Sequence, residues 1–176
     1  MSRRITLVLG VVAVAGATVL AGNAAATPSV GLTTKILAKS TLDSTRLSGS
    51  AHLNDDRGSS SAHDDWRVFL KTHGLTDAYI VDNVLDTSGT TGWHTHPGPS
   101  IIFVVRGTVT NYDSDAKGCV GHDYAAGSSF TDPGGNDVHM LKNNGTEQAE
   151  TIAVQFLPTG AARKTDATVP PGCPAS

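Results

Sequence analysis

The sequence predicts an all-β fold in which short antiparallel strands form a sandwich or a small barrel. Segments rich in β-branched and aromatic residues are separated by turns at intervals of about eight to twelve residues. The chain has 19 glycines and 8 prolines, which supply the tight turns that such folds need. No convincing amphipathic helix pattern is present. A charged fraction of 16% and a hydrophobic fraction of 39% are typical of a folded domain.

The first 26 residues are predicted to be a signal peptide that is not part of this domain. Residues 2–4 include two arginines, residues 5–20 are apolar, and three alanines at 24–26 fit the small-residue pattern at a cleavage site. The apolar run of about 16 residues is shorter than the roughly 20 needed to span a bilayer. We therefore expect cleavage, not a membrane anchor, and a secreted protein.

The charge of the mature chain argues against nucleic acid and anionic membranes as partners. Cleavage after residue 26 removes two of the 13 basic residues and none of the 16 acidic ones, so the net charge becomes −5. Both kinds of partner need a basic surface. The mature sequence contains no cluster of lysines or arginines.

The rest of the chain is divided by composition. The predicted parts are an N-terminal strand and polar loop at 27–65, a β-barrel domain at 66–160 and a Pro-rich tail at 161–176. In the first part, 35–42 is strand-like, and 43–65 is polar enough to be a surface loop. His52 and His63 lie in that loop, and we interpret both as solvated rather than metal-bound.

Each predicted strand of the barrel domain is bounded by turn residues. The strand-like segments are 66–72, 77–86, 101–105, 108–112, 122–127, 128–131, 138–141 and 149–157. The turn at Arg106-Gly107 predicts a hairpin between the strands on either side of it. Phe103 and Phe130 are expected in the core, and His122 is expected to face solvent.

The two cysteines, Cys119 and Cys173, are predicted to form a disulfide bond. An exported chain meets an oxidising environment, where an even number of cysteines usually means a bridge. This bridge would join the tail to a loop in the middle of the domain and stabilise the fold by on the order of 4 kcal/mol. The alternative is a pair of free thiols.

Two histidines one residue apart, His94 and His96, suggest a metal site. On an extended chain, the two-residue period points both rings to the same face, whereas Trp93 points away and is expected to pack in the barrel. Imidazole suits zinc, iron, copper and nickel. A third histidine, His139, follows 43 residues later, flanked by strand-like residues.

The order of these residues resembles the cupin superfamily over about residues 77–157. The residues that carry the two motifs are His94, His96 and Gly107 in the first, and Gly127, Pro133, Gly135, His139 and Asn143 in the second. The resemblance implies a jelly-roll β-barrel of antiparallel strands with a divalent metal in its mouth. It implies that His94, His96 and His139 are the ligands and that Asn143 is structural.

The sequence departs from the family pattern at three points. Ser100 stands where the first motif usually has a glutamate ligand, and serine is a poor metal ligand. Gly89 is one residue closer to the histidines than usual, and three residues separate Gly135 from His139 where two are typical. The expected site therefore has three neutral histidines and open positions for water or substrate.

We therefore expect an exported cupin that binds a divalent metal ion (Fe, Mn, Zn or Ni) through three histidines and a small molecule at the same place. The alternative is a metal-dependent oxygenase-type enzyme, because some cupins with three histidines are iron-dependent oxygenases. Zinc in this set would instead favour hydrolysis, by lowering the pKa of a bound water to about 7. The fold alone does not decide between binding and catalysis. Strand exchange in similar proteins makes a homodimer a candidate state.

Overall fold

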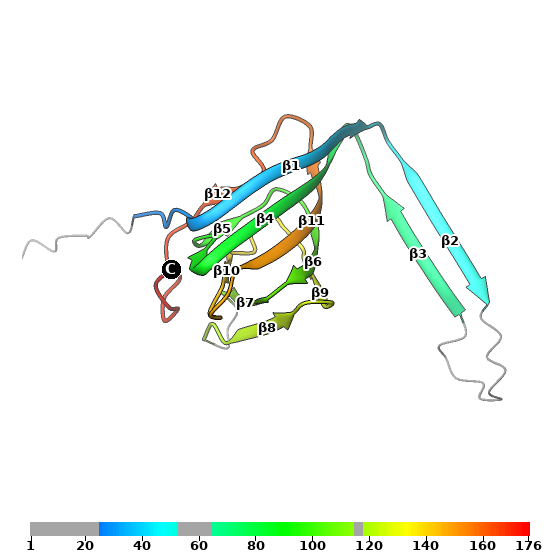
Figure 1. Ribbon diagram of the computed structural model, residues 1–176. Coiled ribbons are helices and arrows are strands. Elements are labelled where there is room, and N and C mark those ends of the chain that lie inside the picture. Colours follow the sequence, from blue (N-terminus) through cyan, green and yellow to red (C-terminus); the bar gives the residue numbers. More distant parts are fainter. Residues whose placement is uncertain (1–24, 53–64, 115–117) are drawn as a thin grey trace, which may run out of the picture.

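The computed structural model describes residues 25–52, 65–114 and 118–176. All of the regular secondary structure in this part of the chain is β-strand, as the turn-rich sequence predicts. The strands are antiparallel and form a nearly closed barrel (Figure 1). The described residues include no helix that is long and apolar enough to cross a membrane. The predicted signal peptide lies almost entirely outside the described residues.

The barrel is a ten-stranded sheet whose two halves face each other. In the first half the order is β1 (Val30–Leu42), β4 (Thr76–Thr90), β11 (Ala149–Pro158), β6 (Ser100–Arg106) and β9 (Ser129–Asp132). In β11 every second side chain from Ala149 to Leu157 is buried. This alternation is the period-2 pattern of a strand with one face in the core.

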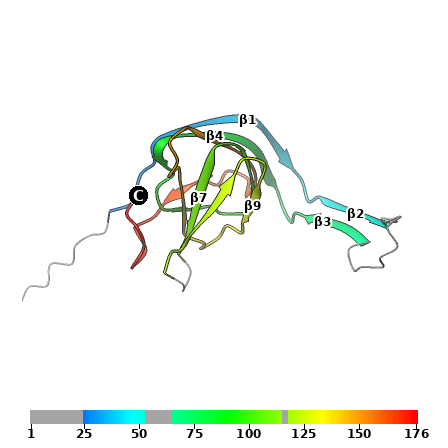
Figure 2. The same cartoon turned by 60° about the horizontal axis from the view of Figure 1, so that its bottom comes forward.

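The second half contains the shorter strands. Its order is β12 (Thr165–Asp166), β5 (His94–Thr95), β10 (His139–Lys142), β7 (Thr108–Asp113) and β8 (Gly121–Ala125). One pair, Lys142 with Thr90, joins it to the end of β4. Figures 1 and 2 show β1 and β4 along one side of the barrel and β7 on the other.

The prediction of a hairpin at Arg106-Gly107 is wrong. β6 pairs with β11 and β9, whereas β7 pairs with β10 and β8, so the two strands belong to different halves. One residue, Gly107, separates them, and the commonest tight hairpin loops have two. Gly107 has a φ of 69°, and a Cβ there would lie 2.8 Å from the carbonyl oxygen of Gln148. This position therefore requires glycine for a sharp corner.

The predicted loop at 43–65 is also partly wrong. It contains β2 (Arg46–His52), which pairs with β3 (Asp65–Lys71) along its full length. The pair projects from the barrel as an arm (Figures 1 and 2). A polar segment can form a strand because pairing satisfies its backbone N–H and C=O groups. The hydrophobic pattern of the sequence does not reveal such a strand. Residues 53–64, with His63, lie outside the described residues.

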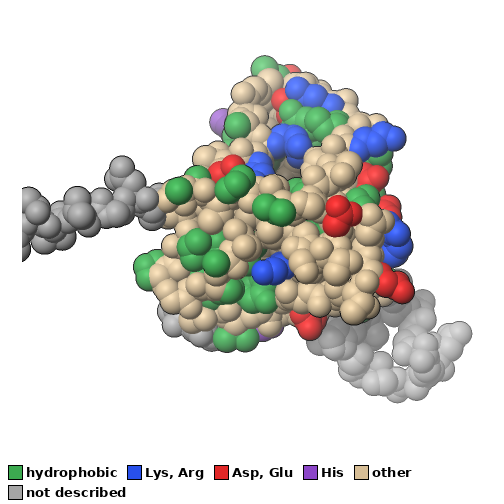
Figure 3. Space-filling model, turned by 60° about the vertical axis from the view of Figure 1, so that its left-hand side comes forward, with side chains coloured by type: hydrophobic (Ala, Val, Ile, Leu, Met, Phe, Trp, Pro, Cys, Tyr) green, Lys and Arg blue, Asp and Glu red, His purple; other side chains and the backbone are tan. Residues whose placement is uncertain are grey.

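The core consists of three groups of buried side chains. They are Tyr79, Val81, Ile102, Ala153 and Leu157; Leu85, Val104, Val109, Leu141 and Ala149; and Trp93, Cys119 and Met140. Phe130 is half-buried and packs against the first two groups. Phe103 is 44% exposed, so its predicted core position is wrong, because alternate residues of β6 face outward. Figure 3 shows hydrophobic side chains dispersed among polar and charged ones on one face.

The third group fixes the C-terminal tail to the barrel. Cys119 and Cys173 are joined by the predicted disulfide. Trp93 is fully buried, as expected, and its indole N–H donates to the carbonyl oxygen of Pro174 at 3.0 Å. Trp93 immediately precedes His94 and Met140 immediately follows His139, so this group supports the backbone of two histidines.

Candidate metal centre

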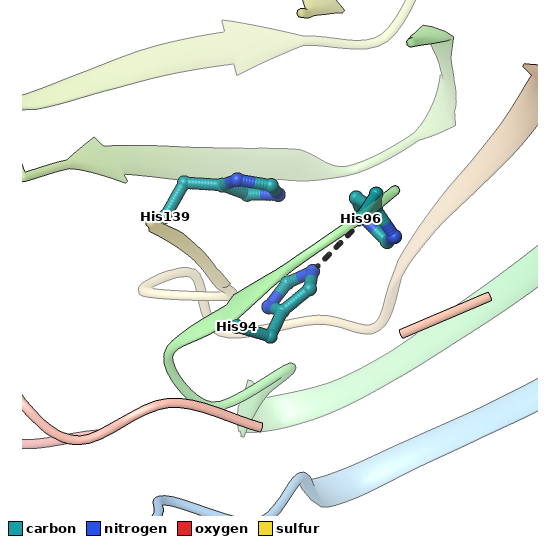
Figure 4. Close-up of side chains that lie close together, drawn as sticks. All are labelled: His94, His96 and His139. Atoms are coloured by element: carbon teal, nitrogen blue, oxygen red, sulfur yellow. Dashed lines mark hydrogen bonds between the residues drawn. The ribbon is translucent and has the colours of Figure 1, made fainter. Parts of the chain in front are cut away.

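The structure brings together the three histidines that the sequence predicts to form a site. His94 on β5 and His139 on β10 are direct partners across the two strands, and their ring centroids are 4.4 Å apart. The ring of His96 lies 4.7 Å from that of His94 and 5.3 Å from that of His139. Figure 4 shows the rings converging on one space. His94 is 3% and His139 is 4% exposed, and His96 is half-buried.

The outer nitrogen of each ring faces a backbone carbonyl. The Nδ1 atoms lie 2.8 Å (His94 to Gly92), 2.5 Å (His96 to Arg163) and 3.4 Å (His139 to Asp137) from these oxygens. A carbonyl oxygen only accepts, so in the neutral ring Nδ1 carries the proton and Nε2 carries the lone pair. Carbonyl partners of this kind orient metal-binding histidines in many proteins.

The inner nitrogens are close enough to share an ion. The Nε2 atoms of His94 and His96 are 3.1 Å apart. Two nitrogens bound to one metal at about 2.1 Å each, with octahedral or tetrahedral angles, are about 3.0–3.4 Å apart. In the tautomers set by the carbonyls, neither of these two nitrogens has a proton to donate to the other. Their separation therefore fits a shared cation.

Burial keeps the rings of His94 and His96 neutral, which is the form that binds metals. The pKa of His94 is lowered to about 2, first by loss of solvation and then by the neighbouring His139 and His96. The pKa of His96 is also lowered, again mainly by burial. Removing an imidazole from water penalises its charged form. At neutral pH both side chains therefore offer lone pairs instead of positive charge.

Asp132 at the end of β9 is a site residue that the sequence reasoning missed. Its side chain is buried, with Oδ2 3.6 Å from Nε2 of His96 and 3.8 Å from Nε2 of His139. In the sequence, Asp132 is followed by Pro133, Gly134 and Gly135, a combination that indicates a turn and not a metal ligand. Alternation along β9 could have shown only that its side chain points inward, as does that of Phe130 two residues earlier.

Ser100, at the position of the usual glutamate, faces the cavity but contacts other side chains. It lies between Gln155 on β11 and Asp132 on β9, its direct partners on either side. Gln155 Nε2 donates to Ser100 Oγ at 3.3 Å, and Arg163 Nη1 donates to Gln155 Oε1 at 3.0 Å. Gln155 thus faces inward, and the hydroxyl of Ser100 has a hydrogen-bond partner.

A cavity of about 80 Å³ adjoins the histidines. It is lined by Leu32, Thr34, Asn83, Thr91, His94, His96, Ser100, Ile102, Phe130, Asp132, His139, Leu141, Thr151, Ala153, Gln155, Arg163 and Lys164. Because one water needs roughly 10–15 Å³ on this scale, the space suits a few waters or a small molecule. Arg163 and Lys164, from the segment after β11, place two basic side chains at its edge.

Two further residues singled out in the sequence lie away from the cavity. Asn143 is fully buried just after β10, where its amide donates to the carbonyl oxygens of Leu85, Asp86 and Glu147 and its Oδ1 accepts from Gly145 N–H. These contacts fit a structural role. His122 on β8 is exposed, as expected, and does not reach the three histidines.

Comparison with known proteins finds a family match for the part of the chain that holds the histidines. Residues 84–155, which contain both histidine motifs, match the family model described as Cupin domain. No curated protein sequence matches the chain significantly.

Three solved structures are similar at low identity. A cupin-like protein from Thermotoga maritima is 22% identical over 52% of this chain and 65% of its own, with a TM-score of 0.45. A cupin domain from Bordetella pertussis is 20% identical over 45% and 80%, with a TM-score of 0.39. A polyketide cyclase from Streptomyces resistomycificus is 17% identical over 54% and 65%, with a TM-score of 0.44. This chain thus spans slightly less than two thirds of the first and third. Both histidine motifs lie inside the matched region, on an all-β antiparallel barrel, so residues 84–155 are a cupin domain.

Proposed function

We propose that the protein binds one divalent metal ion through the Nε2 atoms of His94, His96 and His139, and that a small molecule binds beside the ion in the barrel cavity. The observation that carries this proposal is the arrangement of the ring nitrogens. All three Nδ1 atoms face backbone carbonyls, and two Nε2 lone pairs meet at 3.1 Å. Without a cation or a proton between them, lone pairs at this separation repel each other.

The donor set suits transition metals that accept imidazole. Three neutral rings leave coordination positions for water or a ligand, in contrast to the closed sites of structural zinc. The ion would supply a Lewis acid that holds an anionic or carbonyl oxygen of the small molecule.

The cavity supports a small ligand with an anionic group. Its volume of about 80 Å³ is well below the roughly 300–1,000 Å³ of pockets for drug-sized molecules. Arg163 and Lys164 line it, and Lys164 is paired with Asp166. With a divalent ion bound, the positive charges at the cavity exceed the negative charge of Asp132. A small carboxylate would satisfy both charge and size.

Metal analysis of the mature protein tests the proposal. We expect elemental analysis after native purification to find about one metal ion per chain in the wild type and almost none in His96→Ala. His122→Ala is the matched control, because it removes an exposed imidazole outside the site, and it should retain the metal. Wild-type protein without metal, and without affinity for added Zn²⁺, Fe²⁺, Mn²⁺ or Ni²⁺, would contradict the proposal.

The same sample separates ligand binding from catalysis. A rise in melting temperature on adding small carboxylates, without their consumption, would support a binding protein. Bound iron together with oxygen uptake on adding a diketone or thiol would instead support the oxygenase-type alternative.

A further inference from the structure

We propose that Asp132 supplies a fourth ligand, through Oδ2, to the metal ion held by the three histidines. The inference rests on the proposed metal centre and goes beyond it, because it changes the donor set, the charge of the site and the metals that it favours. It is carried by the position of a buried carboxylate oxygen that has no hydrogen-bond donor in the described part of the chain.

One oxygen of the Asp132 carboxylate accepts a hydrogen bond from the backbone, and the other oxygen faces the histidines. Oδ1 accepts from the N–H of Gly134 at 2.8 Å, in the turn that follows β9. Oδ2 is buried and has no hydrogen-bond partner among the described residues. Such buried acceptors are rare, because losing water without replacement costs free energy.

The two histidine nitrogens beside Oδ2 are too distant to form hydrogen bonds with it. They are Nε2 of His96 at 3.6 Å and Nε2 of His139 at 3.8 Å. In His96 the carbonyl of Arg163 holds the proton on Nδ1, so Nε2 is itself an acceptor. Several acceptors that converge without a donor are the arrangement that a cation stabilises.

The backbone places Asp132 at the site firmly. Gly135 N–H donates to the carbonyl oxygen of His96 at 2.7 Å, which ties the turn after β9 to a histidine of the site. Gly134 has a φ of 72°, and a Cβ there would lie 2.3 Å from the carbonyl oxygen of Gly98. The turn therefore packs closely on the segment after His96, and Asp132 is held with it.

Asp132 also has a distinct position among the acidic residues near the histidines. It is the one acidic residue that lines the cavity in the described part of the chain, and it pairs directly with Ser100 across β6 and β9. Cβ atoms of such partners are about 4.5–5.5 Å apart. Asp137 lies on the outer side of His139, with Oδ2 3.9 Å from Nδ1. The carboxylate of Asp132 on β9 thus lies next to Ser100, the position at which the family usually has a charged glutamate.

A fourth ligand of this type changes the chemistry of the centre. Three imidazoles around a divalent ion give a site of charge +2, and one carboxylate lowers it to +1. A set of three nitrogens and one oxygen suits zinc, iron or manganese better than the softer metals that prefer sulfur.

Titration of metal-free mature protein with Co²⁺ tests the proposal, with calorimetry for affinity and visible absorption for coordination. Asp132→Asn keeps the shape and the Oδ1 acceptor but removes the charge. We expect about 100-fold weaker Co²⁺ binding or more, with a changed spectrum. Asp137→Asn is the matched control, since it removes the same charge beside the outer nitrogen of His139. It should weaken Co²⁺ binding by less than about tenfold and leave the absorption spectrum unchanged.

The outcomes separate this inference from the proposed function. If wild-type protein binds Co²⁺, His96→Ala does not, and Asp132→Asn binds as the wild type does, only the role of Asp132 is overturned. Equal losses in the two Asn variants would also overturn it, because charge and not coordination would then matter. No binding by the wild type overturns both proposals.

A second measurement does not depend on a folded variant. In a structure of the wild-type Co²⁺ complex, Oδ2 of Asp132 should lie about 2.0–2.2 Å from the ion, a typical carboxylate–metal distance. A separation beyond about 3 Å would refute ligation. Metal-free Asp132→Asn should also melt at or above the wild-type temperature, because a buried unpaired charge is gone.

Discussion

Removal of the disulfide should destabilise the fold and weaken the proposed metal centre at the same time. Cys119 and Cys173 are separated by 54 residues. For a loop of this length the chain-entropy relation gives about 4 kcal/mol at 25 °C. We therefore expect Cys119→Ala/Cys173→Ala to lower the free energy of unfolding by about 4 kcal/mol, a large part of the 5–15 kcal/mol typical of a domain.

The effect on the metal centre follows from what the disulfide touches. Cys119 packs with Trp93 and Met140, the chain neighbours of His94 and His139. Loss of the bridge frees the tail whose Pro174 carbonyl accepts the indole N–H of Trp93. The rings keep their carbonyl partners, so we expect a loss of about tenfold in metal affinity, at the low end for indirect support.

Urea unfolding of metal-free protein, followed by far-UV circular dichroism, measures the stability, and calorimetric titration with Co²⁺ measures the affinity. Wild-type protein under a strong reductant is the control, because it loses the bond but keeps both sulfur atoms. A double variant within about 1 kcal/mol of the oxidised wild type, with unchanged affinity, would refute this reasoning.

Two further predictions concern stability. Asn143→Ala removes the buried amide that donates to the carbonyl oxygens of Leu85, Asp86 and Glu147, and it should cost about 2–3 kcal/mol in urea unfolding while Co²⁺ affinity stays the same. A loss of metal affinity without a loss of stability would contradict its structural role. Metal-free protein should lose stability as the pH falls below about 6.5, because the unfolded chain protonates His94 and the folded one, whose pKa is lowered to about 2, does not. His94→Gln should reduce this slope by up to about 1.4 kcal/mol per pH unit, and equal slopes in the two proteins would disprove the assignment.

The sequence was most informative where the signal is local. Alternation along an extended chain placed His94 and His96 on one face and turned Trp93 into the core, because side-chain direction follows from strand geometry alone. Glycine and proline marked most strand ends for a similar reason, since a positive φ is a local requirement. The second motif brought in His139 through its resemblance to a family, which spacing alone would not have justified.

The sequence was least informative about which strands pair. The turn at Gly107 has the composition of a hairpin, yet β6 and β7 separate into different halves of the barrel. Strand pairing depends on contacts between residues far apart in the chain, and no local pattern encodes them. Asp132 was missed for the same reason, because its closeness to His96 depends on where β9 lies relative to β5.

The residues themselves thus determined the all-β class, the strand-forming segments, the cysteine pair and the types of metal-binding side chains, because each depends on backbone preferences and chemistry within a few residues. Only the tertiary structure decided the strand order, the carbonyl partners that orient each imidazole, and the buried carboxylate beside them. Those features depend on the closing of the barrel, which brings the ends of β5, β9 and β10 and the segment after β11 around one small cavity.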